Sequence, residues 1–137
     1  MKKILVLCTG NSCRSQIAEA YLRKFAQNKA EVFSAGIEAH GLNPVAILTM
    51  KEDGIDISNH TSNTIDEYMG TQFDLVITVC DNAKERCPVF PSTAKVFHHN
   101  FPDPAKATGT KEEILQQFRE VREMIKEYSL RFIEQEL

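Results

Sequence analysis

One stretch of the chain has residue types and spacing that could hold and attack an anion. Residues 8–15 read Cys-Thr-Gly-Asn-Ser-Cys-Arg-Ser, between an apolar run and a helical pattern. A strand-to-helix turn of this kind points backbone N–H groups into one concavity, and the helix adds its positive dipole end. Such donors favour the thiolate of Cys8, which is its nucleophilic form. The stretch predicts an anion-binding loop with a reactive cysteine; the alternative is a tight turn containing an ordinary buried cysteine.

Arg14 is the cation of this loop. The C-x5-R spacing returns its guanidinium to the Cys8 side, where its planar fork can hold two oxygens of a tetrahedral oxyanion. Ser15 could hydrogen-bond the Cys8 sulfur or cap the helix that follows. Cys13 could pack in the core or could cap an oxidised Cys8, and we favour packing. The other predicted oxyanion-binding residues of the loop are Thr9, Gly10, Asn11 and Ser12.

A second pair of cysteines, Cys80 and Cys87, lies far from the loop in sequence. Cys80 follows the most strand-like run of the chain, so it could simply be a small core residue. The polar residues 81–86 are compatible with a short helix that Pro88 ends. In a helix the two cysteines would stand about 10.5 Å apart along the axis, whereas a disulfide needs Cα atoms within about 7 Å. We hypothesise that the segment is at least partly helical when reduced and must unwind or loop out before the two sulfurs bond.

Asp103 lies between two prolines, which hold it in an extended and rigid loop. A carboxylic acid there could donate a proton to an oxygen that leaves the anion site. The alternative is a turn-forming aspartate, which is common in such a context. The catalytic interpretation requires that the fold bring Asp103 to Cys8 and Arg14.

The elements expected to position these residues alternate between strands and helices. Apolar runs without helical period predict strands, and apolar residues at steps of three and four predict helices. Asn43 before Pro44 starts one helix, and Thr110 with Glu113 makes a capping box that starts another. Strands are expected at 3–7, 31–36, 73–79 and 94–98, and helices at 15–26, 44–53, 81–86 and from 111 over about 25 residues, with one or two helical turns at 65–69.

This alternation predicts a single α/β domain over residues 1–137. We expect a central, parallel, four-stranded sheet flanked by helices on both faces. Ligands of open α/β sheets bind beyond the carboxyl ends of the strands. Cys8, Cys80 and Asp103 follow the first, third and last predicted strands. We therefore expect these three residues to gather at one edge of the sheet.

Composition limits the classes of function. The 137 residues carry a net charge of −3, so no global basic field attracts nucleic acid or a membrane surface. The apolar runs are far shorter than a membrane span, and the N-terminus enters a strand without a signal-peptide pattern. We expect a cytoplasmic monomer in which the four cysteines are catalytic, redox-active or metal-binding rather than a static disulfide framework.

Metal binding is the weaker interpretation of the cysteines and histidines. The histidines show no metal-ligand spacing and are expected at the surface or at strand edges. The cysteines lack the close pairs of a zinc site, and an arginine beside a zinc thiolate would serve no purpose. No metal site is predicted from these residues, which are His40, His60, His98, His99, Cys8, Cys13, Cys80 and Cys87.

Residues 8–15, with Asp103-Pro104 downstream, resemble the low-molecular-weight protein tyrosine phosphatase family, and the similarity extends over the whole chain, including residues 54–62. Within that family, Cys80 and Cys87 in residues 79–88 resemble the thioredoxin-coupled arsenate reductases. The loop alone does not separate a phosphatase from a reductase, whereas the cysteine pair does. Phosphatases of the family usually carry tyrosines just after Asp-Pro, and the Ala105-Lys106 found here favours the reductase.

The resemblance implies a mechanism. Cys8 attacks an arsenate held by residues 9–14, Arg14 holds its oxygens, and Asp103 assists the loss of one oxygen as water. Cys80 then attacks the Cys8 sulfur, arsenite departs, and a Cys8–Cys80 disulfide remains. Cys87 next attacks Cys80 and carries the disulfide to the surface, where thioredoxin reduces it. No organic cofactor is required.

The resemblance also bears on potassium. Some members of the family bind this ion near the loop through residues that match Asn11, Glu19 and Ser34. A fourth position, usually aspartate, is Asn63 in this chain. The missing carboxylate weakens the expectation of a potassium site.

Two other functions fit parts of the pattern. A phosphatase acting on phosphotyrosine or small phosphate esters would need Cys8, Arg14 and Asp103 but not Cys80. A non-catalytic module that senses arsenic or zinc would use the cysteines as ligands and would need no Asp103.

Overall fold

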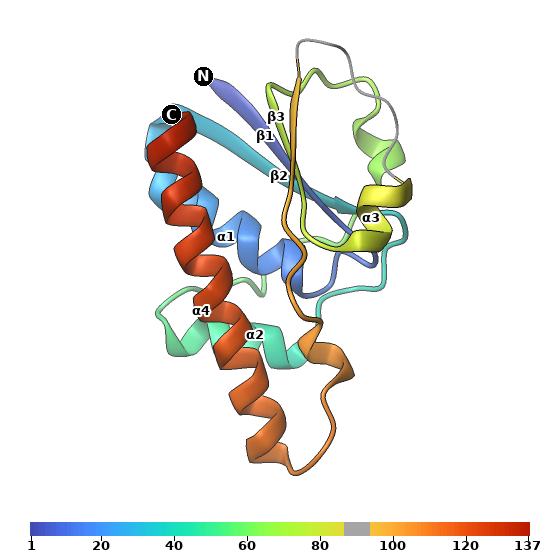
Figure 1. Ribbon diagram of the computed structural model, residues 1–137, viewed down its shortest axis with the longest axis vertical. Coiled ribbons are helices and arrows are strands. Elements are labelled where there is room, and N and C mark those ends of the chain that lie inside the picture. Colours follow the sequence, from blue (N-terminus) through green and yellow to red (C-terminus); the bar gives the residue numbers. More distant parts are fainter. Residues whose placement is uncertain (87–93) are drawn as a thin grey trace.

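The apolar run near the start of the chain forms β1 (Lys2–Cys8), which has a parallel partner on each side in the computed structural model (Figure 1). The structure describes residues 1–86 and 94–137. β2 (Ala30–Gly36) and β3 (Leu75–Thr78) flank β1, and β4 (Lys95–His98) pairs with β3, so the strand order is β2-β1-β3-β4. The expected parallel four-stranded sheet is confirmed.

Neighbouring residues of β2 show that both faces of the sheet are covered. The Ser34 hydroxyl donates to Glu19 on α1 (Arg14–Ala26), whereas the Phe33 ring lies 5.6 Å from the Tyr68 ring of η2 (Ile65–Tyr68). Adjacent side chains of a strand point to opposite faces. α1 therefore covers one face and η2 the other, as the α/β pattern predicts.

The longest helix, α4 (Lys111–Glu136), packs against α1 and against α2 (Pro44–Glu52) (Figure 1). Of its apolar residues at steps of three and four, Ile114 and Tyr128 are partly buried and the others are buried, as their spacing predicts. The deepest of them are Phe118, Val121, Ile125 and Phe132. Together with four fully buried residues of β1, Ile4 to Leu7, they form much of the core around the sheet.

The helix starts are set by local hydrogen bonds. Asn43 Oδ1 accepts from the backbone of Val45 and Ala46, at 2.8 and 3.2 Å. Thr110 and Glu113 form the expected reciprocal capping box at the start of α4. Both predicted caps are confirmed.

Within the described residues, no helix is both long enough and apolar enough to cross a bilayer.

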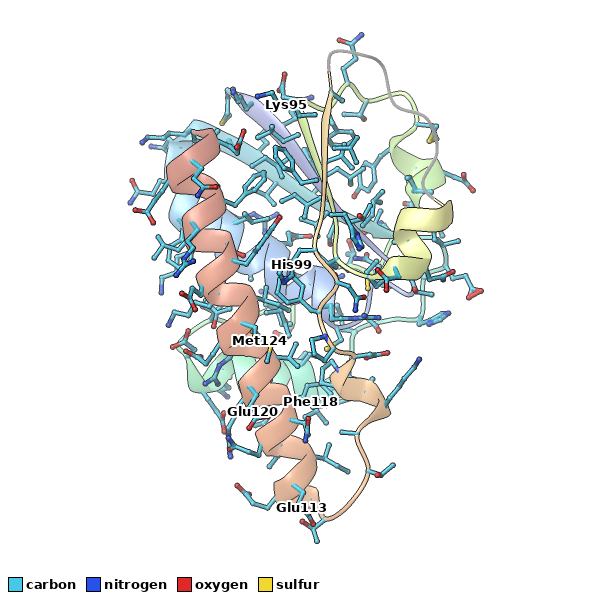
Figure 2. All side chains as sticks on the ribbon, in the orientation of Figure 1. Lys95, His99, Glu113, Phe118, Glu120 and Met124 are labelled. Atoms are coloured by element: carbon cyan, nitrogen blue, oxygen red, sulfur yellow. The ribbon has the colours of Figure 1, made fainter. Side chains whose placement is uncertain are left out.

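The structure differs from the sequence-based elements mainly at their ends. The third strand is shorter than predicted, because Phe73 leaves the sheet ladder to pack against Phe33 and Tyr68. Two short 3-10 helices were not predicted, η1 (Gln27–Lys29) and η3 (Pro104–Lys106). Lys95 at the start of β4 and His99 just after it mark how short that strand is (Figure 2).

The short helix expected after Cys80 is present as α3 (Asp81–Arg86). Cys87 and the end of the predicted relay segment lie outside the described residues. The sulfurs of Cys8, Cys13 and Cys80 are all free thiols in this structure. A helical segment next to a reduced Cys80 agrees with the hypothesis that this segment is helical in the reduced protein.

Candidate active site

The carboxyl ends of β1 and β3 and the loop after β4 meet at one cavity of about 510 Å³. This is the convergence that the strand-end argument predicts, because parallel strands all end at the same edge. Its lining includes Thr9, Arg14, Cys80, Asn82, Asp103 and Lys106. Residues far apart in the chain therefore form a single chemical site.

The backbone carbonyls at the start of the loop between β1 and α1 point toward the segment that follows β2. The carbonyls of Cys8, Thr9 and Gly10 accept hydrogen bonds from the backbone of residues 37, 38 and 40, at 3.2, 2.9 and 2.9 Å. In contrast, within residues 1–86 and 94–137, no backbone N–H from 10 to 16 donates to a protein oxygen. These N–H groups remain available to an anion, which is the arrangement of a phosphate-type cradle.

Asn11 holds this loop in shape. Its backbone has a φ of +48°, in the left-handed region that asparagine tolerates better than most residues. Its fully buried side chain donates to Ser15 Oγ and to Ser34 Oγ, both at 2.9 Å, and accepts from the Asn63 N–H at 2.8 Å. Gly36 permits the close approach, since a Cβ there would lie 2.8 Å from the Asn11 nitrogen. Asn11 thus acts as a brace for the cradle, a role the sequence did not reveal.

Ser15 has a different partner from the ones its position suggested. Its hydroxyl oxygen accepts from Asn11, and the residue, like Asn11, is fully buried. The expectation that Ser15 caps α1 is wrong, because the helix begins one residue earlier and Cys13 is its N-cap without a side-chain bond. At this end of α1, no side chain of the described residues accepts from the first backbone N–H groups, so these groups are available to an anion.

Arg14 and Asp103 approach each other across the cavity. Arg14 donates from one terminal nitrogen to the carbonyl of Phe101 at 2.9 Å, and its other terminal nitrogen lies 3.6 Å from Asp103 Oδ2. Asp103 is held in turn by the Ala105 N–H, which donates to its other oxygen at 3.0 Å. These two partners hold the guanidinium at the wall of the cavity, which Arg14 and Asp103 both line.

Cys8 and Cys80 form a coupled pair of buried thiols. A hydrogen bond with Cys8 is the largest cause that lowers the pKa of Cys80, to about 5, and hydrogen bonds from Thr9 and the Ala83 backbone assist. The same bond with Cys80, followed by burial, raises the pKa of Cys8, while Arg14 and the Thr9 N–H act in the opposite direction. The pair therefore loses one proton readily and keeps the other, so two sulfurs share one negative charge at neutral pH.

Thr9 and Asn82 support this charge at Cys80. Thr9 Oγ1 lies 3.3 Å from the Cys80 sulfur, and Asn82 Nδ2 donates to the same oxygen at 3.1 Å. Because the amide occupies an acceptor position of Thr9, the hydroxyl hydrogen is free to point at the sulfur. Asn82 was not singled out from the sequence, where its only signal is a place two residues after Cys80.

Cys13 differs from the other two thiols. Burial and, after it, the charge of Asp103 raise its pKa to about 12. A thiol that stays protonated and has 4% of its surface exposed behaves as a core residue. The structure thus supports the packing interpretation of Cys13.

The residues that match a potassium site lie together but bond to one another. Ser34 donates to one oxygen of Glu19 at 2.6 Å, and Arg23 lies 2.9 Å from the other. The Asn63 side chain instead bonds to Thr61 and Glu67. Since the only carboxylate of the set already has a cation beside it, these residues do not fit a potassium site.

Three comparisons with known proteins agree with this geometry. The sequence model of a family described as "Low molecular weight phosphotyrosine protein phosphatase" matches residues 3–137. A protein named arsenate reductase from Halalkalibacterium halodurans is 53% identical over 124 residues, which cover 90% of this chain and 89% of the relative. One of the same name from Bacillus subtilis is 52% identical with the same coverage. A solved structure described as "An arsenate reductase in the phosphate binding state" superposes with a TM-score of 0.80 at 34% identity, covering 98% of both chains.

Proposed function

Because this chain belongs to the low molecular weight phosphotyrosine protein phosphatase family, we propose that it uses the family's anion cradle to reduce arsenate to arsenite. The observation that carries the proposal is the second thiol: the sulfur of Cys80 lies 3.3 Å from the hydroxyl oxygen of Thr9, the residue next to the Cys8 nucleophile. Hydrolysis of a phosphate ester needs no second thiol beside the nucleophile, whereas reduction of arsenate by thiol exchange requires one. Relatives about half identical to this chain bear the name arsenate reductase.

Oxyanion capture is the first step. The free N–H groups of the loop and the guanidinium of Arg14 would hold the oxygens of arsenate by charge-assisted hydrogen bonds. This recognition reads tetrahedral shape and charge, so phosphate and sulfate would bind as weaker mimics. The phosphate-binding state described for a structural relative supports this step.

Attack by Cys8 is the second step. The one proton that the two sulfurs hold moves to Cys80, so that Cys8 attacks as the thiolate. An S–As bond forms while one As–O bond breaks, and the protonated form of Asp103 gives its proton to the departing oxygen, which leaves as water. The 3.6 Å approach of Asp103 to Arg14 supports this role, because it brings the acid next to the oxygens that Arg14 holds. No electrons have yet reached arsenic.

Reduction occurs when Cys80 attacks the Cys8 sulfur. An S–S bond forms, the S–As bond breaks, and its electron pair stays with arsenic, which passes from As(V) to As(III). Arsenite then departs and a Cys8–Cys80 disulfide remains. Cys80 loses its proton to solvent and attacks as a thiolate, a form that the hydrogen bonds from Thr9 and the Ala83 backbone favour even while Cys8 carries arsenic.

Cys87 completes the relay in this proposal. It attacks Cys80, restores the Cys8 thiol and leaves a Cys80–Cys87 disulfide for thioredoxin to reduce. The exchange needs α3 to unwind, as the spacing of the two cysteines indicates. A cytoplasmic monomer suits this cycle, since that compartment keeps thiols reduced.

The test is thioredoxin-coupled arsenate reduction by the wild type and by Cys80→Ser and Cys87→Ser. We expect both variants to lose multiple turnover while hydrolysis of an aryl phosphate persists, because hydrolysis uses only the cradle, Arg14 and Asp103. Unimpaired arsenate turnover in either variant would reject the relay. A wild type that hydrolyses aryl phosphates but forms no arsenite would favour the phosphatase alternative.

A further inference from the structure

The imidazole of His98, the last residue of β4, bridges the two residues on either side of the Val79-Cys80 turn. Its Nδ1 lies 2.7 Å from Thr78 Oγ1, and its Nε2 lies 2.8 Å from Asp81 Oδ1. Thr78 ends β3, Asp81 begins α3, and Cys80 lies between them in the chain. A single ring therefore fixes both ends of the segment that presents the second thiol.

The donors and acceptors of this bridge are mutually consistent. The Asp81 carboxylate accepts only, so the Nε2 nitrogen of His98 carries a hydrogen. With that tautomer Nδ1 is an acceptor, and the buried hydroxyl of Thr78 can donate to it at 2.7 Å, whereas the other acceptor near this hydroxyl, the Phe97 carbonyl, is farther away at 3.4 Å. Both contacts are satisfied by a neutral ring, and no third partner is needed.

Backbone bonds from the residues after β4 hold the same turn. The N–H groups of His99 and Phe101 donate to the carbonyls of Thr78 and Val79, at 3.0 and 3.1 Å. Asn100 Oδ1 accepts from the Asp81 N–H at 3.1 Å. Residues 78, 79 and 81 are thus tied to the 98–101 segment, and His98 supplies the contacts between side chains in that connection.

The expected effect of losing His98 is on position rather than on folding. Asp81 is largely exposed, with 70% of its side-chain surface accessible, and a solvent-exposed contact of this kind contributes little to stability. A small displacement of a reacting group, in contrast, can slow a reaction greatly. His98 makes none of the described contacts of Arg14, Asp103 or the 8–15 loop.

We propose that His98 is a positioning residue that holds Cys80 next to Cys8 for the exchange that forms the Cys8–Cys80 disulfide. This inference rests on the proposed function, in which that disulfide forms as arsenic is reduced. Without the bridge, Thr78 and Asp81 lose the ring that joins their side chains, and the Cys80 sulfur samples positions from which it cannot attack. Anion binding and attack by Cys8 proceed as before.

The experiment follows formation of the Cys8–Cys80 disulfide in single turnover, in full-length protein carrying Cys87→Ser so that the relay stops there. Samples mixed with arsenate are quenched by alkylation, and the bond is counted by mass spectrometry. We expect His98→Ala to slow bond formation about tenfold, with KM for an aryl phosphate and its hydrolysis rate unchanged. His98→Gln, which can keep a donor for Asp81, should recover part of the rate.

Three further variants and one further oxidant make the result decisive. Val96→Ala, on the same face of β4 and 55% exposed, is the matched control and should react like the parent. Asp81→Ala removes the other end of the bridge and should reproduce the slow rate even where His98→Ala folds poorly. Cys13→Ser reports any general effect of altering a thiol in the loop.

A parallel arm with diamide separates failure of this inference from failure of the proposed function. Diamide oxidises the two thiols directly to the same disulfide and is itself reduced to a hydrazine, so no arsenate chemistry is involved. Slowing by His98→Ala with diamide, in a parent that does not react with arsenate, would support the positioning role and reject arsenate reduction. Equal rates in His98→Ala, Asp81→Ala and Val96→Ala would overturn the positioning role.

Discussion

The sulfur of Cys80 lies 3.3 Å from the hydroxyl oxygen of Thr9, although 71 positions separate the two residues in the chain. β1 and β3 are neighbours in the sheet and end at the same edge, so the residues that follow them meet. This contact brings a second thiol to the nucleophile, and it changes the chemistry expected of an anion cradle from hydrolysis to thiol exchange.

Cys80 should titrate as an unusually acidic thiol. Its pKa is lowered to about 5, mainly by the hydrogen bond with Cys8. The Cys80 thiolate should therefore persist through neutral pH and be lost as the pH falls through about 5. The pH at which the Cys80 thiolate is lost can be measured from the difference in ultraviolet thiolate absorbance between the wild type and Cys80→Ser. Cys8→Ala, which removes the hydrogen bond, should raise that pH. If the thiolate of the wild-type protein instead formed in the ordinary pH range of cysteine, Cys8 and Cys80 would not share a negative charge at neutral pH.

Arg14→Lys should weaken oxyanion binding. Lysine keeps the positive charge but cannot reproduce the planar fork, which at present also donates to the Phe101 carbonyl. Loss of one charge-assisted hydrogen bond corresponds to roughly a tenfold to hundredfold rise in the dissociation constant of phosphate. Calorimetric titration with phosphate measures it, with the exposed Arg131→Lys as control. If Arg14→Lys bound phosphate as tightly as the wild type, Arg14 would not be a residue that holds the oxyanion.

Asp103→Asn should impair the chemical step more than binding. The amide cannot give up a proton, so we expect the hydrolysis rate of an aryl phosphate to fall about a hundredfold or more. Phosphate affinity should not fall, because a negative charge near Arg14 has been removed. Steady-state kinetics together with phosphate titration separates the two effects. If Asp103→Asn hydrolysed the aryl phosphate as fast as the wild type, Asp103 would not be the proton donor and would only form the turn.

Potassium should have little effect on this protein. Arg23 already lies beside Glu19, and Asn63 is turned toward Thr61 and Glu67. Turnover in potassium chloride should equal turnover in tetramethylammonium chloride at the same ionic strength. A rate several times higher in potassium would show that the ion displaces the contacts among Glu19, Ser34 and Asn11.

Asn11→Ala should destabilise the protein more than loss of a helix cap. The change removes two buried hydrogen bonds and one partly buried one and places alanine at a positive φ, which together suggest about 3 kcal/mol or more. Thr110→Ala, which removes the exposed cap of α4, should cost about 1 kcal/mol. Urea unfolding of both variants tests the order. If the two losses were equal, Asn11 would not brace the cradle.

Much of the fold was predictable because its signals are local. The caps at Asn43 and Thr110 depend on residues two or three positions away, and the long C-terminal helix shows its apolar period directly. The unpredicted details depend on distant partners. β3 begins later than predicted because Phe73 packs against rings from β2 and η2, and the sequence around Phe73 does not indicate these partners.

The sequence alone indicated the anion loop, because a strand, the C-x5-R spacing and a helix start lie within one short stretch. The bonds that hold the shape of the loop come from distant residues, among them Ser34 and Asn63. The sequence also indicated that Cys80 and Asp103 follow strands, and hence that they share an edge with Cys8. Only the tertiary structure decided which side chains touch there: Thr9 with Cys80, Arg14 with Asp103, and His98 with both Thr78 and Asp81. The physical reason is that such contacts depend on the order β2-β1-β3-β4, and alternation of strands and helices along a chain does not specify the order of strands in a sheet.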